Sequence, residues 1–313
     1  MPSALVLGVN GQDGSYLAQN LLARGYRVTG IGRQANSKYV PDDPAFTYVS
    51  CDLRETARLI GVLTQTRFDT VFHFAAVHGS SGFFYEPVWA DMMAVNVLSL
   101  HAVLEHARLA NRNLRVIYAG SAKVFPAPFQ GTINEKTTMQ ATCLYGIGKL
   151  AARDLMREYR NVHQIASTNL IFFNHESPRR PLNYFLQQIT GVVAKAKLDP
   201  STHHSVQTLD FYADWSAAEE LMDIAIDVAE KSDDPEFVEA SGLTVNAREA
   251  VTDFFACHNL NLANHISEKS HKSAPPEMFQ VDISHLKTIT GRKPRFGVQD
   301  IMEDMLRAHM ETE

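Results

Sequence analysis

The stretch that decides the fold is Gly8-Val-Asn-Gly11-Gln-Asp-Gly14, near the start of a chain of 313 residues. An apolar run that predicts a strand over residues 4–8 precedes it, and an amphipathic pattern that predicts a helix over residues 14–24 follows it. Glycines at this spacing permit a tight turn, and the helix N-terminus offers free N–H groups to a pyrophosphate. We interpret the stretch as a dinucleotide-binding turn, with a plain strand-to-helix turn as the alternative.

The same alternation of strand and helix continues through the first half of the chain. Strands are predicted over residues 26–31, 46–50, 70–74, 115–118 and 167–172, and helices over 56–64, 89–107 and 144–159. This rhythm predicts a parallel sheet with right-handed crossovers. After residue 174 it gives way to helical patterns over residues 182–196, 216–230, 246–257 and 298–309. We predict an α/β, doubly wound Rossmann-type domain over 1–173 and a smaller, mostly helical substrate cap over 174–313, with some chain returning to the sheet.

Composition narrows the class of protein. The chain is 45% hydrophobic and 20% charged, which is ordinary for a globular protein. Its net charge of −6 argues against a nucleic-acid binder, because phosphate neutralisation needs clustered Lys and Arg. The cysteines are few, odd in number and scattered, which argues against a disulfide framework or a metal site. We see neither a signal peptide nor a membrane span and expect a cytoplasmic protein.

The second strand is followed by Arg33, at the point where an NAD site usually carries an acidic residue. A guanidinium suits a 2′-phosphate, so we expect NADP, with NAD possible and a solvated surface arginine as the competing interpretation. Asp52 is expected to meet the adenine amine, and small residues after the fourth strand leave room for the diphosphate. The predicted cofactor-binding residues are Gly8, Asn10, Gly11, Gln12, Asp13, Gly14, Arg33, Asp52, Leu53, Phe74, Ala75, Ala76, Tyr145 and Lys149.

Tyr145-Gly-Ile-Gly-Lys149 is the second informative pattern. A spacing of i and i+4 puts the phenol and the ammonium on one helix face, where the lysine can lower the phenol pKa and hold the nicotinamide ribose. The tyrosine can then act as general acid or base toward a carbinol or ketone. Ser121 ends the preceding strand and could hydrogen-bond the same oxygen. We predict Ser121, Tyr145 and Lys149 as the catalytic residues.

With these residues in place, the chain resembles the extended short-chain dehydrogenase/reductases, and most specifically the GDP-mannose 4,6-dehydratase family. The resemblance lies in Val9-Asn-Gly11-Gln-Asp-Gly14-Ser-Tyr-Leu17 and in Leu170-Ile-Phe-Phe-Asn174-His-Glu-Ser-Pro-Arg-Arg180. It implies NADP and a nucleotide-diphosphate sugar, GDP-linked, with chemistry at C4 and with Asn174 on the sugar diphosphate. It also implies that the helices over 89–107 and 144–159 pack against a second subunit, giving a homodimer or homotetramer; their apolar faces could instead simply be core.

Departures from that family bear on the reaction. A 4,6-dehydratase needs a base near C5, and the family supplies a glutamate two positions after its active-site Ser or Thr. Here that position is Lys123, which would have to be neutral to accept a proton, and the nearest downstream acid is Glu135. Cations of the family are replaced at Gln187-Gln188, Ala213 and Ala274-Pro275. The predicted substrate-binding residues are Ser121, Lys123, Asn174, Arg179 and Arg180; for the two arginines a surface or subunit contact is an equal alternative.

Three interpretations stay open. The leading one is an oxidoreductase that transfers a hydride at a sugar C4 carbinol or ketone, which needs no C5 base. The second is a 4,6-dehydratase with a relocated base. The third is a non-catalytic dinucleotide-binding protein, against which the intact Ser121, Tyr145 and Lys149 argue. His73 and His78 flank the end of a predicted buried strand and are expected to be structural.

Overall fold

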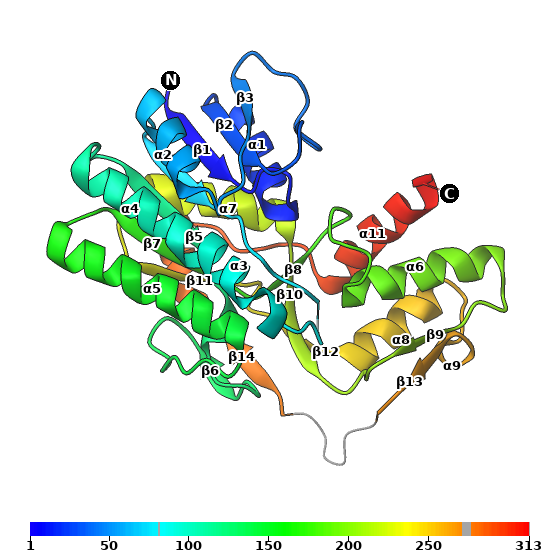
Figure 1. Ribbon diagram of the computed structural model, residues 1–313. Helices are drawn as coiled ribbons and strands as arrows, with labels where there is room; N and C mark the ends of the chain where they lie inside the picture. The colour runs from blue at the N-terminus through cyan, green and yellow to red at the C-terminus, as the bar shows by residue number, and fades with distance from the viewer. Residues whose placement is uncertain (81, 271–276, 313) are drawn as a thin grey trace.

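The computed structural model describes residues 1–80, 82–270 and 277–312 and centres on a seven-stranded sheet (Figure 1). Its order is β11-β7-β5-β4-β1-β2-β3, and every neighbouring pair is parallel. The strands are β1 (Ser3–Leu7), β2 (Arg27–Gly32), β3 (Phe46–Ser50), β4 (Thr70–His73), β5 (Arg115–Ala119), β7 (Ser167–Phe172) and β11 (Glu236–Glu239). The predicted α/β Rossmann-type class is confirmed.

The strand order reverses between β1 and β4, which is where open α/β sheets form their ligand crevice. Leu7, the last residue of β1, pairs with Ile31 of β2 and with His73 of β4. The carboxyl ends of these strands are therefore level. The chain leaves β1 directly into Gly8, whose N–H donates to the Ile31 carbonyl at 2.9 Å. This register places the glycine turn at the carboxyl ends of the strands, next to the point where the strand order reverses.

Helices cover both faces of the sheet (Figure 1). On one side α1 (Gln12–Ala23) packs against α7 (Ala218–Lys231), and α10 (Ser284–Thr290) lies beside α7. On the other side α2 (Thr56–Gln65), α4 (Ser99–Leu109) and α5 (Leu144–His163) form the second layer. Two apolar cores result, one on each face of β1. The α7 helix and β11 come from the second half of the chain, so this half contributes to the Rossmann unit as well.

The rest of the second half forms the cap, with α6 (Phe185–Leu198), α8 (Ala247–Cys257), α9 (Leu262–His265) and α11 (Val298–Thr312) grouped away from the sheet in Figure 1. Its separate core includes Leu186, Trp215, Phe254 and Met302. Short strands interleave with these helices: β8 (Asn174–Glu176), β9 (His204–Val206), β10 (Tyr212–Ala217), β12 (Thr244–Asn246) and β13 (Ile266–Glu268). Two more, β6 (Gly131–Ile133) and β14 (Phe279–Val281), pair beside the main sheet.

Several predicted helices differ from the observed ones in their ends, as α5 and α6 do, and two differ for a structural reason. The pattern over 89–107 is broken into α3 (Trp89–Met93), a π-helical turn (Ala94–Leu98) and α4. The pattern over 216–230 begins two residues late, because Ser216 and Ala217 complete β10 instead. The segment Glu86–Leu109 is also long and apolar enough to span a membrane by length and composition alone. Half of its most apolar window is buried inside the fold, as in a core helix, and Leu100 and Val103 belong to the apolar core beneath the sheet.

Candidate active site

The glycine turn fits a dinucleotide. Gly8 has φ +92°, and a Cβ there would lie 2.7 Å from the Ala75 backbone. A Cβ on Gly14 would lie 2.7 Å from the Gly8 carbonyl carbon, so α1 packs against the turn without a side chain between them. Gly11, at the N-cap of α1, offers no side-chain cap to the first-turn N–H groups. These donors are suited to a pyrophosphate.

Several other predicted cofactor residues fix the surroundings of the turn. Asn10 Nδ2 donates to Gln34 Oε1 and to the Asn36 carbonyl, both at 3.0 Å, and Asn10 Oδ1 accepts the Lys38 N–H. This side chain therefore anchors the loop that follows β2. Phe74 N–H donates to the Leu7 carbonyl at 3.0 Å. Ala75 lies against Gly8, and Ala76 is exposed.

The residues predicted to bind the adenosine part of the cofactor follow β2 and β3 in the chain. Arg33 is exposed. The Asp52 carboxylate is bound by Arg54 through Nη2 at 2.7 Å, and the pKa of Asp52 is lowered by Arg54 and, to a smaller extent, by Arg33. Leu53 is buried. Arg33 and Asp52 thus lie within electrostatic reach of each other, on the edge where the predicted ribose and adenine would meet.

Tyr145 and Lys149 come together on the inner face of α5. Tyr145 is 7% exposed and Lys149 is 1% exposed. Lys149 Nζ donates to the Ala119 carbonyl at 2.6 Å, and it lies 4.5 Å from the ring centre of Tyr118 and 5.6 Å from that of Tyr145. The last residue of β5 therefore holds the ammonium group beside the phenol, as the i, i+4 spacing predicts.

The expected lowering of the phenol pKa is not what this arrangement produces. Burial, with smaller contributions from Tyr118 and Tyr85, raises the pKa of Tyr145 well above its usual range. Burial also lowers the pKa of Lys149 to about 7, against the opposing charge of Asp13. Since desolvation disfavours both charged forms, the phenol keeps its proton in the ligand-free protein.

Ser121 lies beyond the end of β5 and begins a tight 3-10 turn, Ala122–Val124. Its Oγ accepts the Lys123 N–H at 3.2 Å. The turn packs directly on α5, and a Cβ on Gly146 would collide with the Lys123 carbonyl. Glycine next to Tyr145 thus lets the serine turn approach the catalytic helix.

The two candidate groups for a C5 base have different surroundings. Lys123 is exposed, and its charge reaches His78. Glu135 is turned toward the sheet, where its Oε1 accepts the Val238 N–H at 2.9 Å. This carboxylate therefore has a structural role at β11.

The segment from Asn174 to Arg180 is bound to the first turn of α1 by an ion pair and a hydrogen bond. Asp13 Oδ1 lies 3.0 Å from His175 Nε2, and Ser177 Oγ donates to Gln12 Oε1 at 2.9 Å. Burial opposes both charges, yet the ion pair keeps the pKa of Asp13 low and that of His175 raised. Gln12 and Asp13, predicted from the sequence as cofactor residues, therefore also join the turn to the substrate-side loop.

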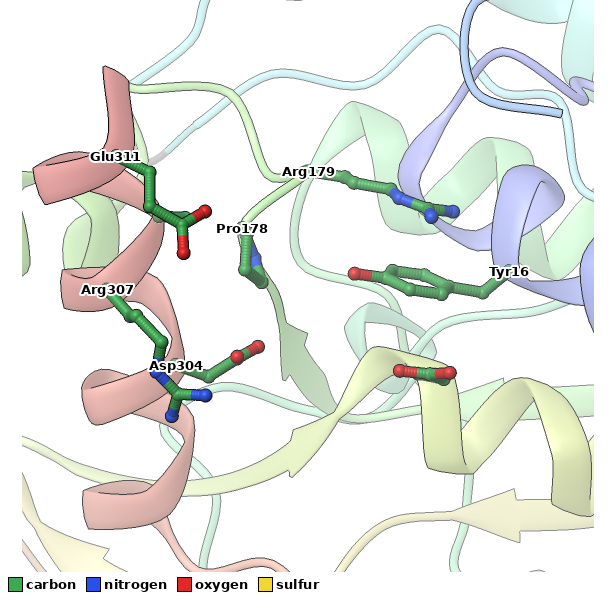
Figure 2. A pocket seen from close by; sticks show the side chains of 8 residues that line it. Tyr16, Pro178, Arg179, Asp304, Arg307 and Glu311 are labelled. Atoms are coloured by element: carbon green, nitrogen blue, oxygen red, sulfur yellow. The ribbon is translucent and has the colours of Figure 1, made fainter. Parts of the chain in front are cut away.

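The two arginines of that loop point to different places. Arg179 donates to Ser15 Oγ at 2.9 Å and to Gln19 Oε1 at 2.8 Å, and its guanidinium lies 3.8 Å from the ring centre of Tyr16. Figure 2 shows the side chains of Arg179 and Tyr16 next to each other. Arg179 lines a 450 Å³ cavity between α1 and α11. Arg180 lies 3.4 Å from Glu176, and its charge reaches Tyr145. The Arg180 guanidinium also lies 3.9 Å from the ring centre of Tyr184, so it is held between Glu176 and that ring.

Other predicted positions are less central. Asn174 is exposed at the start of β8 and pairs with Trp215. Gln187 Nε2 donates to the Ser177 carbonyl at 3.1 Å, so it supports the loop. Ala213 is buried in β10. Ala274 and Pro275 lie outside the described residues.

His78, Tyr85 and Asn96 were not among the predicted site residues. The His78 ring centre is 4.3 Å from that of Tyr145, and its Nδ1 is 2.8 Å from the Tyr85 hydroxyl. Asn96, in the π-helical turn, accepts the Val77 N–H at 2.9 Å. The expectation of a structural histidine holds for His73, which is fully buried against Ser99. For His78, which is more than a third exposed but hydrogen-bonded to Tyr85 through Nδ1, it stays a prediction.

Comparisons with known proteins identify the family of this chain. Residues 5–305 match the family model described as GDP-mannose 4,6 dehydratase. GDP-mannose 4,6 dehydratase 2 of Arabidopsis thaliana is 27% identical, over 98% of this chain and 87% of its own length. The Caenorhabditis elegans protein of the same name is 28% identical, over 81% and 70%.

A solved structure shares the fold at lower identity. The dTDP-glucose 4,6-dehydratase of Bacillus anthracis, in complex with NAD, superposes with a TM-score of 0.83 and 14% identity, covering 99% of this chain and 97% of the other. The family match, which spans nearly the whole chain, includes both the glycine turn and the Tyr145–Lys149 helix. The chain belongs to the GDP-mannose 4,6-dehydratase family.

Proposed function

We propose that the protein transfers a hydride at the C4 carbinol or ketone of a nucleotide sugar, GDP-linked, with NADP(H) as its cofactor. The names of its relatives support the substrate class. The observation that carries the reaction is the buried pair of Tyr145 and Lys149 beside the glycine turn. When bound, the nicotinamide supplies a hydride acceptor or donor.

Each catalytic residue has a defined part in this proposal. Tyr145 gives a proton to the C4 oxygen or takes one from it, and Ser121 donates a hydrogen bond to the same oxygen. A phenol that keeps its proton suits the reducing direction. Lys149, held by the Ala119 carbonyl, supports the phenol and the cofactor ribose. Arg180 is the stronger of the two arginines as a substrate contact, because its charge reaches Tyr145, whereas Arg179 is bound to α1.

NADP rather than NAD is part of the proposal. Arg33 is exposed at the adenosine edge beside Asp52, where a 2′-phosphate would find a free guanidinium. The Bacillus anthracis neighbour was solved with NAD, so the preference is a property we assign to this chain's own residues.

A second candidate is a 4,6-dehydratase with a relocated base, which the family and the names of the relatives favour. Incubation with GDP-mannose and NADP+ separates the two. Simple oxidation leaves reduced nicotinamide, read at 340 nm, whereas dehydration gives a 4-keto-6-deoxy sugar with no net reduction. Accumulation of the dehydrated product would overturn the leading proposal.

The Tyr145→Phe variant tests whether the protein is catalytic at all. Loss of the phenol should lower turnover by about 10³-fold or more while leaving dinucleotide binding intact. A protein that only binds the dinucleotide would behave the same with and without the hydroxyl.

We further propose a homodimer or homotetramer in the cytoplasm. Leu109 of α4 and Ile147 and Val162 of α5 are exposed on the outer helix layer, which supports assembly through these helices. Light scattering of the purified protein measures the oligomeric state.

A further inference from the structure

His78 is held rigidly against the catalytic tyrosine. Its ring is tilted by 32° over that of Tyr145, at 4.3 Å between ring centres. The Tyr85 hydroxyl contacts His78 Nδ1 at 2.8 Å and accepts the Gly79 N–H at 3.2 Å. On the other side, Asn96 Oδ1 accepts the N–H of Val77, the residue that directly precedes His78. Hydrogen bonds thus flank His78 on both sides, and its ring lies against that of Tyr145.

Two tautomers of His78 fit these contacts, because the Tyr85 hydroxyl can either donate to Nδ1 or accept from it. We use the second, in which Nδ1 carries the proton. The Tyr85 oxygen can accept both the Gly79 N–H and an Nδ1–H of His78, since a hydroxyl has two acceptor lone pairs. The lone pair of His78 Nε2 is then available. Within the described residues, no hydrogen bond to Nε2 is found, and His78 as a whole is exposed.

The charges around His78 keep its ring neutral. Partial burial against the aromatic rings, together with the positive charges of Arg180, Lys149, His175 and Lys123, lowers the pKa of His78. These cations come from the 174–180 loop, from α5 and from the serine turn; the other titratable groups near the ring are the phenols of Tyr85, Tyr145 and Tyr184. The ring is therefore neutral at pH 7, but the lowered pKa makes it a weaker base than a free imidazole, so what favours it as a base is its position against Tyr145.

The carboxylates near the site have other partners. Asp13 is paired with His175, Glu176 lies beside Arg180, and Glu135 binds the β11 backbone. His78 is therefore the neutral base that lies against the catalytic phenol.

We propose that His78 removes the proton from a carbon next to C4 when C4 of the sugar is a ketone. The proposal rests on the proposed function, which puts C4 at Tyr145. The C–H bond breaks, its proton passes to His78 Nε2, and its electron pair forms the enolate, whose charge on the C4 oxygen is hydrogen-bonded by Ser121 and Tyr145. Because a ketone is the reactant, no oxidant is needed. Return of a solvent-exchanged proton completes the cycle.

Proton exchange measures this step without hydride transfer. The protein is loaded with NADP+, which cannot reduce a ketone, and is given GDP-4-keto-6-deoxymannose in D₂O. Deuterium entering C3 or C5 is followed by NMR. The wild-type protein should exchange one of these positions faster than protein-free buffer, and His78→Gln should slow that exchange by about 100-fold or more. His163→Gln, at the far end of α5, is the matched control and should exchange as the wild type does.

Two results would overturn the proposal: wild-type exchange no faster than in buffer, or His78→Gln exchanging at the wild-type rate. Dinucleotide binding by His78→Gln, measured by fluorescence, checks that the variant is folded. On the unmodified chain, ¹⁵N NMR should show a neutral Nδ1–H ring for His78 at pH 7, and a protonated ring would contradict the account. Oxidation of GDP-mannose is read separately, so its absence alongside His78-dependent exchange would count against the proposed function only.

Discussion

The glycine turn and the catalytic cluster lie at the same edge of the sheet, but they are built in different ways. The turn comes from one continuous stretch after β1, and its shape follows from glycines whose Cβ atoms would meet backbone. The cluster around Tyr145 gathers side chains from the β4 loop, the serine turn, α5 and the 174–180 loop. Cofactor binding is thus encoded locally, whereas the reaction depends on contacts between distant segments.

The largest expected effect comes from a change in the glycine turn, which is the locally encoded region. Gly14→Ala puts a Cβ 2.7 Å from the Gly8 carbonyl carbon, so either the turn or α1 must shift. We expect loss of dinucleotide binding and a destabilisation of several kcal/mol, measured by fluorescence titration and chemical denaturation. Gly61→Ala in α2 is the control, because its Cβ meets nothing within 4 Å. It should leave binding unchanged and stabilise by about 0.5–1 kcal/mol.

The next effect concerns the ion pair of His175 with Asp13, which joins the 174–180 loop to the first turn of α1. His175→Gln leaves Asp13 without its ion-pair partner and should cost roughly 3 kcal/mol of unfolding free energy near pH 5.5. His175 has a raised pKa, so its contribution is complete below its usual value of 6.5 and is lost as the pH rises through the folded value. Asp13 has a lowered pKa, so its contribution is present above 3.8 and is lost as the pH falls through the folded value.

The gap between wild type and His175→Gln should therefore shrink at pH 9, as followed by urea denaturation at both pH values. A gap that is the same at pH 5.5 and pH 9 would contradict the assigned ion pair.

The smallest effect lies at the edge of the cofactor site. Arg33→Ala should raise the KM for NADP by about 10–100-fold, because one charge-assisted contact is lost, and should leave the KM for NAD nearly unchanged. Since Arg33 is exposed, the melting temperature should stay the same. Equal changes in KM for NADP and NAD would show that Arg33 does not contact the 2′-phosphate.

The same contrast explains what could be predicted from the sequence. The strands over 46–50 and 167–172 were predicted with their exact bounds, because alternating or continuous apolar runs mark them. The three-residue strands β8, β12 and β13 were missed, since pairing with distant chain creates them and they are too short for a period.

In the candidate site, too, contacts within one helix could be predicted from the sequence, whereas contacts between distant segments could not. The pairing of Tyr145 with Lys149 follows from helix geometry. The position of His78 against Tyr145 does not, because it depends on Tyr85 and Asn96, which hold the loop after β4. Arg179 and Arg180 are neighbours in sequence, yet one lies over Tyr16 of α1 and the other over Tyr184.

The central claim is that a hydride moves at C4 of a nucleotide sugar. Its most direct test uses GDP-mannose deuterated at C4, with NADP+ and the wild-type protein. We predict that deuterium leaves C4 and appears on the nicotinamide, or at C6 if the sugar is then dehydrated, and that Tyr145→Phe abolishes this transfer. Deuterium that remains at C4 while GDP-mannose is converted, or a transfer unaffected by Tyr145→Phe, would contradict the account.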